Sequence, residues 1–546
     1  MMQEGKRRLK IGIITGKKAY PLIEEVVKSI ERKGKADFII IPLDIGVVSL
    51  ASADLIANKL KNSPSFLKTL KSCDLVLIPG TVKGDAEKIT EITGVTTYKG
   101  GIYPSSISFI VESLLRGEEL STTDPAETFL KMKEEKMLRG TLEQIYRSYE
   151  RAFSIGSIGI PIRPPPIVIA AETPVSMSPD MLEDHARMLE ENGAEIVIAG
   201  LPIDESLEAS MRRIQAVEKG LNRASLGVDS LNPKALIEGA KIGAELLLSL
   251  SEGNMEQLRG VRDRAFVVIP GNPMEGRLPR KGEEAANMLD VALKKAREFG
   301  FEKLIADPVL SPPGIGLSES IKAYYFSSQL LQGIPLFAGL SNVIELFDAD
   351  STGIAALLVQ LLGEIGVSVM LTSEESRKAQ GSTLEARGAS LLSSLSLHLK
   401  APPHNIGIDL LFMKEKETQP EMVFPEGAII EEVKEEPQPR MDEGIFFTIG
   451  INRNDQSIIA CANLSGKNIC FKGKSARALY KKIVSQFESI SKEHAAYLGY
   501  ELSKAELSLA LGKTYIQDSD LLDQLRKKRE SIRGIFQHIW EVRSNG

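Results

Sequence analysis

The sequence is poor in the residues that build metal centres and disulfide frameworks. Its 546 residues include three cysteines, Cys73, Cys461 and Cys470, and five histidines that are spread along the chain. Neither H-E-x-x-H nor any other paired histidine spacing of a metal site occurs, so we expect no metal held by the protein's own side chains. Cysteines so few and so scattered exclude a disulfide framework and favour a reducing cytoplasm.

The sequence also lacks a long apolar run and a strong charge of one sign. The most apolar helix-like stretch, residues 353–371, is interrupted by Gln360 and Glu364, and the start MMQEGKRRLK contains no apolar signal region. Lys and Arg number 67 against 73 Asp and Glu, which gives a net charge of -6. This balance disfavours nucleic acid as a main partner. We therefore expect a cytoplasmic protein that binds neither membranes nor nucleic acid.

Between residues 166 and 396, short apolar runs alternate with amphipathic segments. Runs rich in β-branched residues are typical of strands buried on both faces, and the Glu/Lys/Ala/Leu segments between them carry apolar residues at helical spacing. Repeated strand–helix units without a visible interruption predict a (β/α)8 TIM barrel over residues 166–400. The eight runs are Pro166–Glu172, Glu195–Gly200, Arg223–Asp229, Glu245–Ser251, Arg264–Pro270, Lys303–Asp307, Ile334–Gly339 and Val367–Leu371.

The segment before the barrel has two parts. Residues 1–120 alternate strand and helix patterns and predict an N-terminal Rossmann- or flavodoxin-like α/β domain with parallel strands. Its loop Gly16-Lys17-Lys18 fits neither phosphate-loop spacing, which leaves docking or regulation as the simpler interpretation. Residues 121–165 predict a helical connector, with helices over 127–138 and 142–153.

The segment after the barrel also has two parts. Residues 401–443 predict a strand over 405–412 followed by an acidic, proline-containing linker. Residues 444–546 predict a C-terminal α+β domain, in which a three-stranded antiparallel meander precedes two helices. Four residues of the second helix share one face and are expected to pack against the meander, with contact to a ligand or partner as the alternative: His494, Tyr497, Leu498 and Glu501.

In a TIM barrel, the chemistry lies at the C-terminal ends of the strands. The candidate site residues are the polar side chains that end or follow the predicted strands: Glu172, Asp229, Ser249, Ser251, Asn272, Asp307 and Asn342. The aspartates have a structural alternative as helix caps, since both precede a possible helix start.

Glu172 has two interpretations of its own. It is either an acid of the site or a buried partner of Arg163 or Arg187.

The order of short motifs across the barrel resembles that of pterin-binding barrels. The motifs are Thr173-Pro174, Gly193-Ala194-Glu195, Gly227-Val228-Asp229-Ser230, Gly243-Ala244-Glu245, Ala306-Asp307-Pro308 and Ala338-Gly339-Leu340-Ser341-Asn342-Val343. They are similar to those of dihydropteroate synthases and of methyl-tetrahydrofolate or methyl-tetrahydromethanopterin methyltransferases. Over nearly its whole length the chain resembles the archaeal dihydropteroate-synthase-related proteins, which carry extra N- and C-terminal domains. The C-terminal part resembles a small domain often joined to pterin- or folate-linked proteins.

This resemblance implies that Asp229 and Asp307 bind a reduced pterin of the tetrahydromethanopterin or tetrahydrofolate type. The pyrimidine edge of a pterin presents a 2-amino group and a ring N–H side by side, a donor pair that one carboxylate accepts in bidentate fashion. Apolar side chains would cover the ring faces. Further pterin contacts are expected from Glu172, Ser249, Ser251, Asn272 and Asn342.

Departures from the synthase pattern bear on the reaction. Synthases hold a diphosphate with an Asn and Mg2+ in the first loop, an Arg in the second loop, and Ser-Arg-Lys after the seventh strand. Here the first position is Ala171, the loop 200–203 has no Arg, and the last motif reads Ser341-Asn342-Val343. A synthase would therefore need Mg2+ and substitute cations, for which the sequence offers Arg277, Arg280 and Lys281 or the N-terminal domain.

The motif Gly339-Leu340-Ser341-Asn342-Val343 instead resembles the Gly-x-Ser-Asn-Val of corrinoid-dependent methyltransferases. That resemblance implies that Asn342 hydrogen-bonds the pterin near N5, and it makes Asn342 and Asp307 the predicted catalytic residues; a helix cap is the alternative for Asn342. The resulting hypothesis is a pterin-dependent transferase of one-carbon-carrier metabolism that leans towards methyl transfer, with a corrinoid protein as partner and a homodimeric assembly.

Two alternatives stay open at this point. One is a divergent synthase that condenses hydroxymethyl-dihydropterin diphosphate with an arylamine in tetrahydromethanopterin biosynthesis. The other is a non-catalytic pterin-binding scaffold.

Overall fold

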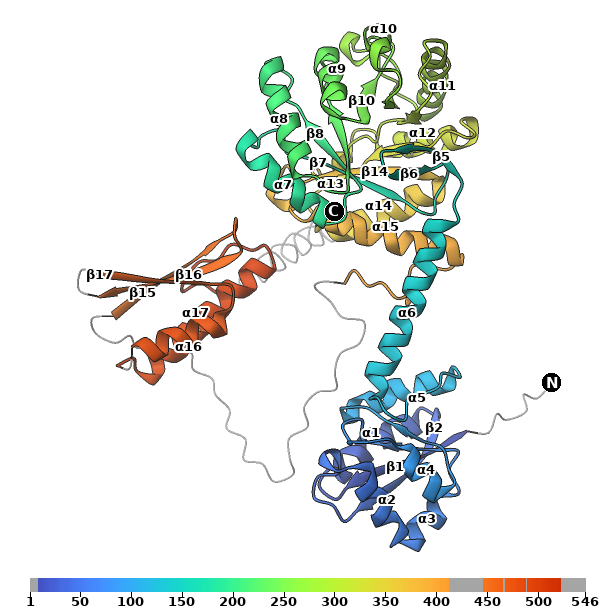
Figure 1. The fold of residues 1–546 in the computed structure, drawn as a ribbon, viewed down its shortest axis with the longest axis vertical. Helices are drawn as coiled ribbons and strands as arrows, with labels where there is room; N and C mark the ends of the chain where they lie inside the picture. Colours follow the sequence, from blue (N-terminus) through green and yellow to red (C-terminus); the bar gives the residue numbers. More distant parts are fainter. Residues whose placement is uncertain (1–7, 412–444, 465–466, 488, 522–546) are drawn as a thin grey trace, which may run out of the picture. The chain divides into compact units, whose positions relative to one another are not determined.

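The computed structural model describes residues 8–411, 445–464, 467–487 and 489–521. The chain divides into two compact units, residues 1–421 and 422–546. The first unit contains an N-terminal α/β domain and a barrel, and the second contains a small α+β domain (Figure 1). Within the described ranges, no helix is both long and apolar enough to pass through a bilayer.

Eight parallel strands close into a barrel in sequence order, and the last strand pairs with the first. All eight apolar runs of the sequence form these strands, so the predicted TIM barrel is confirmed. The strands are β7 (Val168–Glu172), β8 (Ile196–Gly200), β9 (Ser225–Asp229), β10 (Leu246–Leu250), β11 (Ala265–Val268), β12 (Leu304–Ala306), β13 (Leu336–Gly339) and β14 (Val367–Ser373).

Helices surround the strands (Figure 1). Along β7 the side chains alternate: Val168 and Ala170 belong to the layer inside the barrel, whereas Ile169 and Ala171 pack towards the helices. Both layers are apolar, so the barrel interior is a packed core. The helices are α7 (Pro179–Glu191), α8 (Leu207–Gly220), α9 (Pro233–Ile242), α10 (Met255–Leu258), α11 (Gly282–Glu298), α12 (Leu317–Leu330), α13 (Ser341–Ile344), α14 (Ser351–Ile365) and α15 (Ser382–Leu399).

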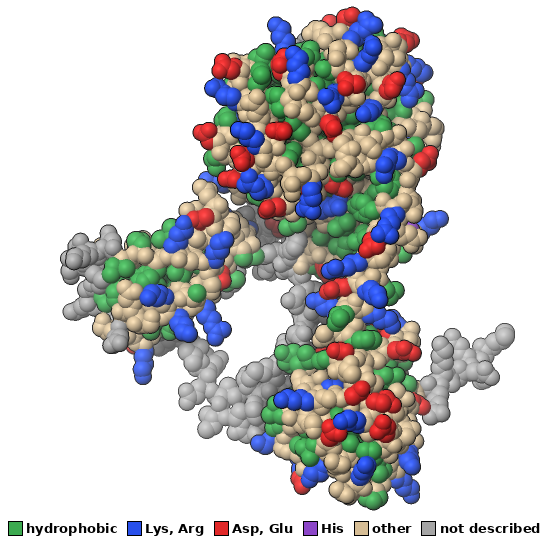
Figure 2. Space-filling model, viewed as in Figure 1, with side chains coloured by type: hydrophobic (Ala, Val, Ile, Leu, Met, Phe, Trp, Pro, Cys, Tyr) green, Lys and Arg blue, Asp and Glu red, His purple; other side chains and the backbone are tan. Residues whose placement is uncertain are grey.

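The barrel surface carries mixed charge. Lys and Arg side chains are interspersed with Asp and Glu side chains over the face of the barrel drawn in Figure 2. This distribution agrees with the near balance of charged residues in the sequence.

A β-hairpin closes the N-terminal end of the barrel. The helix predicted over 142–153 is wrong beyond Arg147, because the chain there enters two antiparallel strands that turn at Gly156, whose φ is 55°. Ile155 and Ile160 join the interior layer, and the Ser225 hydroxyl donates to the Ile155 carbonyl at 2.9 Å. The elements are α6 (Ala126–Arg147), β5 (Arg151–Ile155) and β6 (Ile158–Pro161).

The N-terminal domain is a doubly wound sheet. Its four parallel strands have the order β2-β1-β3-β4, and separate apolar clusters cover the two faces. The order reverses between β1 and β3, where ligands bind in open α/β sheets. The short β4 gave no recognisable run in the sequence. The elements are β1 (Leu9–Gly16), α1 (Tyr20–Arg32), β2 (Ala36–Leu43), α2 (Ala53–Lys61), α3 (Pro64–Leu70), β3 (Leu75–Ile78), α4 (Glu87–Thr93), β4 (Thr97–Lys99) and α5 (Ile107–Leu115).

The C-terminal domain has the predicted order of a meander and two helices. The predicted face of the second helix is buried against the sheet, since His494, Tyr497 and Leu498 are all buried and the His494 ring lies edge-on to Phe447. The elements are β15 (Ile445–Asn452), β16 (Ser457–Leu464), β17 (Lys467–Gly473), α16 (Ala476–Gln486) and α17 (Lys492–Ala510).

Two further expectations need correction. Cys461 and Cys470 form a disulfide, because the antiparallel register of β16 and β17 sets them directly opposite each other. Residues 405–411 form no strand, and the rest of the predicted linker lies outside the described residues.

Candidate active site

Three carboxylic acids lie in the open end of the barrel, at the C-terminal ends of its strands. Glu172 ends β7, Asp229 ends β9, and Asp307 directly follows β12. The residues two positions before Glu172 and Asp307 are Ala170 and Ile305, which belong to the interior layer. Because side chains alternate along a strand, the acids point to the same interior side. The sequence prediction that they share one mouth is therefore supported by the strand geometry.

Asp307 is held in place through one of its two carboxylate oxygens. The Tyr324 hydroxyl and the Val309 N–H both donate to Oδ1, each at 2.8 Å. Tyr324 is fully buried on α12, and Val309 has a φ of 71°, which is a strained value for a β-branched residue. Among the described residues nothing donates to Oδ2. Asp307 thus presents one anchored and one available oxygen.

Asp229 has no hydrogen-bond donor among the described residues. Its alternative role as a helix cap is wrong, because Asn232 caps α9 by accepting the Lys234 N–H at 3.0 Å. A partly buried carboxylate without donors is costly, since it has lost water and gained no partner. This cost is relieved when a ligand brings N–H groups.

Glu172 does not pair with either arginine that the sequence suggested. Arg163 donates to backbone carbonyls, among them that of Ile334 at 2.7 Å, and Arg187 pairs with Asp184 at 2.6 Å. No described residue donates a hydrogen bond to the Glu172 carboxyl group. The interpretation as a buried ion-pair partner is therefore wrong, and the interpretation as an acid of the site is the one left.

The glutamate side chain takes the space beside β8. A Cβ at Gly200 would lie 2.7 Å from Oε1 of Glu172 and also 2.7 Å from the backbone carbonyl oxygen of Thr173, which cannot move aside, so only glycine fits at the end of this strand. The carboxyl group therefore leans over the end of the neighbouring strand and towards the strand that ends in Asp229, which pairs with Gly200 in register.

Burial raises the pKa of all three acids, and neighbouring carboxylates raise it further at Glu172 and Asp229. Burial, followed by the charges of Asp229 and Glu375, raises the pKa of Glu172 to about 8. Burial and the charge of Asp307 raise the pKa of Asp229 to about 6, and burial raises the pKa of Asp307 to about 6. At neutral pH the mouth therefore holds a protonated glutamic acid beside two largely ionised aspartates.

Asn342 ties two loops of the mouth together. Its Nδ2 donates to the Leu310 carbonyl at 2.8 Å, which joins the segment after β13 to the segment after β12. Asn342 is exposed and lies inside α13, whose N-cap residue is Leu340, so the cap alternative is wrong for this residue too.

The remaining predicted contacts lie in the packing of the loops after β10 and β11. Asn254 accepts the Ser251 N–H and donates to the Ser249 carbonyl, each at 2.9 Å. Asn272 is buried against Gly253, where a Cβ would come within 2.7 Å of its amide oxygen. These contacts do not link Ser249, Ser251 or Asn272 to the three acids, and their roles stay predictions.

Three further residues around the mouth could not be recognised from the sequence. Tyr324 lies on an amphipathic helix, where an aromatic residue is typical of the core. Glu375 lies beyond the predicted apolar run, because the strand before it continues past the end of that run. The Glu375 carboxylate accepts the Val175 N–H at 2.8 Å. Arg213 is buried and its guanidinium donates to loop carbonyls, including that of Met177 at 2.6 Å.

The described part of the chain contains no group of three or more His, Cys, Asp or Glu that is arranged to hold a metal ion. Of the cations that the sequence offered for a diphosphate, Arg277 is exposed and pairs with Glu275 at 2.8 Å.

Comparison with known proteins identifies the family. The chain is 31% identical to the uncharacterized protein MJ0107 of Methanocaldococcus jannaschii over 535 residues, which covers 94% of this chain and 99% of the relative. The chain belongs to the family of this archaeal protein. The family PterinBD-DUF4346 matches residues 441–518 of the MJ0107-family chain. The prediction of an archaeal pterin-binding family is thus confirmed by the archaeal relative and by the family model.

Shorter proteins and solved structures match parts of this MJ0107-family protein. The uncharacterized protein ycf91 of Pyropia yezoensis is 41% identical over 87 residues, which are 14% of this chain and 74% of the relative. The structure of Yersinia pestis DHPS with a pterine-sulfa conjugate is 15% identical, covers 45% of this chain and 98% of that chain, and has a TM-score of 0.36. A Xanthomonas albilineans dihydropteroate synthase is 18% identical, with 44% and 96% covered and a TM-score of 0.35.

Proposed function

We propose that the barrel mouth binds the pyrimidine edge of a reduced pterin and that the protein is a pterin-dependent transferase of one-carbon-carrier metabolism. The observation that carries this proposal is the pair Asp229 and Asp307, two acids inside one mouth whose free oxygens have no donors among the described residues. A ligand that fits must bring several N–H donors and little negative charge.

A pterin has these properties. Its 2-amino group and ring N–H form a donor pair that matches one carboxylate, and its ring nitrogens and 4-oxo group offer further hydrogen bonds to neighbouring groups. Each hydrogen bond to an ionised aspartate contributes roughly 1.5–3 kcal/mol. Binding also offsets the burial and the Asp307 charge that raise the pKa of Asp229, because the donors stabilise its ionised form.

The protonated Glu172 supplies the acid that methyl transfer requires. When the bond between the methyl carbon and N5 breaks, the methyl group passes to a nucleophilic acceptor and the electron pair stays on N5. A proton from the Glu172 carboxyl group neutralises that nitrogen, and solvent then reprotonates the carboxylate. With a pKa of about 8, Glu172 keeps this proton at neutral pH. The amide of Asn342, fixed by Leu310, positions the ring near N5.

The charge of the mouth favours a methyl pterin over a pterin diphosphate. Glu172, Asp229, Asp307 and Glu375 are all acidic, whereas the nearby guanidinium of Arg213 is committed to backbone carbonyls. A diphosphate leaving group would develop negative charge beside these acids, which is the reverse of transition-state stabilisation. This supports methyl transfer to a reduced corrinoid over dihydropteroate synthesis.

The experiment is a single-turnover assay with a methyl-tetrahydropterin and cob(I)alamin, followed by the visible spectrum of the corrinoid. We expect wild-type protein to form methylcobalamin. We expect Glu172→Gln to slow the step by about 100-fold or more, as loss of a general acid does, and Asn342→Ala to slow it as well. Asp204→Asn, an exposed acid in the loop after β8, is the matched control and should react like wild type.

The opposite outcomes are equally clear. Release of diphosphate from a hydroxymethyl-dihydropterin diphosphate and an arylamine, dependent on Mg2+, would establish the synthase instead. Pterin binding with neither reaction would establish a scaffold.

A further inference from the structure

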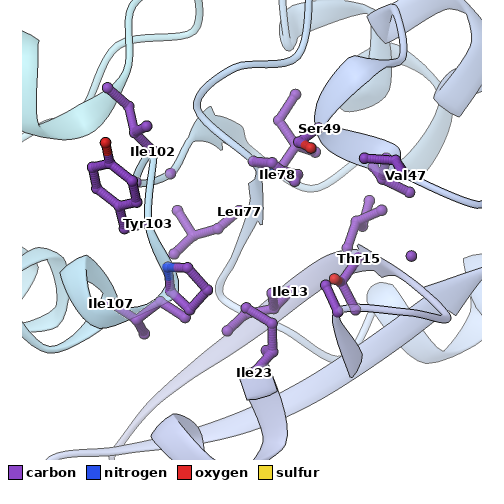
Figure 3. Close-up of a pocket in the computed structure, with 18 of the residues that line it drawn as sticks. Ile13, Thr15, Ile23, Val47, Ser49, Leu77, Ile78, Ile102, Tyr103 and Ile107 are labelled. Atoms are coloured by element: carbon purple, nitrogen blue, oxygen red, sulfur yellow. The ribbon is translucent and has the colours of Figure 1, made fainter. Parts of the chain in front are cut away.

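A cavity of about 200 Å³ opens at the carboxyl ends of β1 and β3 in the N-terminal domain (Figure 3). The strand order of this sheet reverses between the same two strands. Two adjacent strands whose connections leave in opposite directions form a crevice at this point, and it is the usual ligand site of open α/β sheets. The cavity belongs wholly to the N-terminal domain and is independent of the barrel mouth.

The walls of the cavity are mainly apolar. Side chains from the strands, from α1 and from the start of α5 surround it, and Val47 and Tyr103 lie on different sides of it in Figure 3. Glycine at position 16 allows the end of β1 to lie close to the loop after β2, because a Cβ at Gly16 would lie 2.8 Å from the Ile45 carbonyl oxygen. A volume of about 200 Å³ is below the range of roughly 300–1,000 Å³ that suits larger ligands. The cavity therefore suits a single ring or a branched chain and is too small for a nucleotide.

One end of the cavity is polar. Thr15 is 3% exposed, lines the cavity, and its hydroxyl has no hydrogen-bond partner among the described residues. Helix α1 begins at Tyr20, beside the cavity, with no side-chain cap and no acidic residue in its first turn. An uncapped helix start carries a partial positive charge and free N–H groups.

The two lysines of this loop differ in role. Lys18 lines the cavity and makes no ion pair within the described part of the chain, whereas Lys17 pairs with Asp44 at 2.9 Å and does not line it. The polar end thus combines a lysine, a helix start and a buried hydroxyl, each of which favours an anionic group.

We propose that this cavity binds a small molecule with an apolar body and one anionic group, a carboxylate or a phosphate. The anionic group lies at the start of α1, where it meets Lys18 and accepts from the Thr15 hydroxyl. The apolar body lies between Ile13, Leu77 and Ile107. The barrel protein would accordingly carry a second small-molecule site, separate from its pterin site.

The test uses the full-length protein labelled with 13C at the isoleucine methyl groups. The cavity is lined by Ile13, Ile14, Ile23, Ile78, Ile102 and Ile107, which report binding directly. The probes are phenyl phosphate and benzoate, which distinguish a phosphate from a carboxylate, and benzyl alcohol, an uncharged molecule of similar shape. We expect at least one anionic probe to shift the cavity methyl resonances at submillimolar concentration. We expect benzyl alcohol to bind at least about 10-fold more weakly than that probe.

Four variants locate the site. Val47 is exposed at the edge of the cavity, so Val47→Trp should fill the cavity and weaken binding of all probes by 10-fold or more without disturbing the fold. Lys18→Ala and Thr15→Val should weaken the anionic probes several-fold and leave benzyl alcohol unchanged. Lys17→Ala, the matched control, should behave like wild type.

Unshifted cavity methyl groups at millimolar concentrations of every probe would overturn the proposal. So would equal shifts in Val47→Trp, because the probes would then bind elsewhere. Equal effects of Lys18→Ala and Lys17→Ala would overturn the anionic part of the proposal. Methyl resonances of Ile30, Ile56 and Ile89, which are buried in the N-terminal domain but do not line the cavity, show in each variant whether the fold of this domain is retained.

Discussion

Replacing Glu172 with glutamine should stabilise the unliganded protein at high pH. The pKa of this carboxyl group rises from an ordinary value of 4.5 to about 8, mainly through burial. A raised pKa means that the folded state holds the proton more firmly than the unfolded state does. The contribution of this group to the free energy of unfolding therefore falls as the pH rises from about 4.5 to about 8, and this contribution changes no further above that range.

The size of the effect follows from the width of this window. The difference between 4.5 and about 8 is about 3.5 pKa units, and at ~1.4 kcal/mol per unit this gives an upper value of roughly 5 kcal/mol. Because solvent reaches part of the side chain and screens its charge, we expect about 2–3 kcal/mol. Glu172→Gln has a similar shape and no proton to lose, so its advantage over wild type should be small at pH 5 and about 2–3 kcal/mol at pH 8.

The assay is urea unfolding followed by circular dichroism at several pH values. The single tryptophan, Trp540, lies outside the described residues, so its fluorescence is not a suitable reporter of the barrel. Glu208→Gln, at a side chain that is 85% exposed on α8, is the matched control and should show no pH-dependent difference. An advantage of Glu172→Gln that is the same at pH 5 and pH 8 would refute the reasoning.

Three further predictions concern buried polar contacts. Tyr324→Phe removes a hydrogen bond that lowers the pKa of Asp307, so pterin binding should require a higher pH. Binding titrations between pH 6 and 8.5 should show that the variant loses about 3-fold or more in pterin affinity at pH 6.5 and that this loss shrinks by pH 8.5. Arg213→Ala leaves loop carbonyls unpaired and should lower the unfolding free energy by about 2–4 kcal/mol, measured by urea unfolding at pH 7. Glu501→Ala leaves Lys504 buried without its 2.6 Å partner and should cost about 3 kcal/mol, measured by hydrogen exchange of α17. An unchanged pterin affinity at pH 6.5, an unchanged free energy of unfolding or an unchanged hydrogen exchange of α17 would contradict the corresponding prediction.

The barrel could be predicted because each of its strands is buried on both faces and therefore appears as a continuous apolar run. The hairpin β5–β6 could not, because the charged pattern of α6 continues through residues 148–153 and only the turn at Gly156 redirects the chain. Ile155 and Ile160 belong to the interior layer of the barrel, and this placement follows from the tertiary structure alone.

The candidate acids could be predicted because the strand-end rule of TIM barrels applies to single residues. Their protonation states and hydrogen-bond partners could not be predicted. The pKa of Glu172 depends on Asp229, which lies two strands away in the barrel, and the oxygen that Asp307 offers depends on Tyr324, which lies on the following helix. These contacts join residues distant in sequence, so no local pattern contains them.

The cavity of the N-terminal domain could not be predicted, for a different reason. Gly16-Lys17-Lys18 matches no phosphate-binding spacing, so the sequence alone assigns this loop no ligand. The cavity arises because the strand order reverses between β1 and β3. This reversal is visible only when the pairing of the whole sheet, including the short strand β4, is known.

Calorimetric titration of a methyl-tetrahydropterin into wild type and Asp229→Asn at pH 7.5 tests the central claim most directly, with Asp204→Asn as control. Loss of a charged acceptor for two N–H donors is worth roughly 2–3 kcal/mol, or about 30- to 150-fold in affinity. We predict this loss in Asp229→Asn and wild-type affinity in Asp204→Asn. Equal affinity in all three proteins, or no binding to the wild type, would contradict the assignment of the barrel mouth as a pterin site.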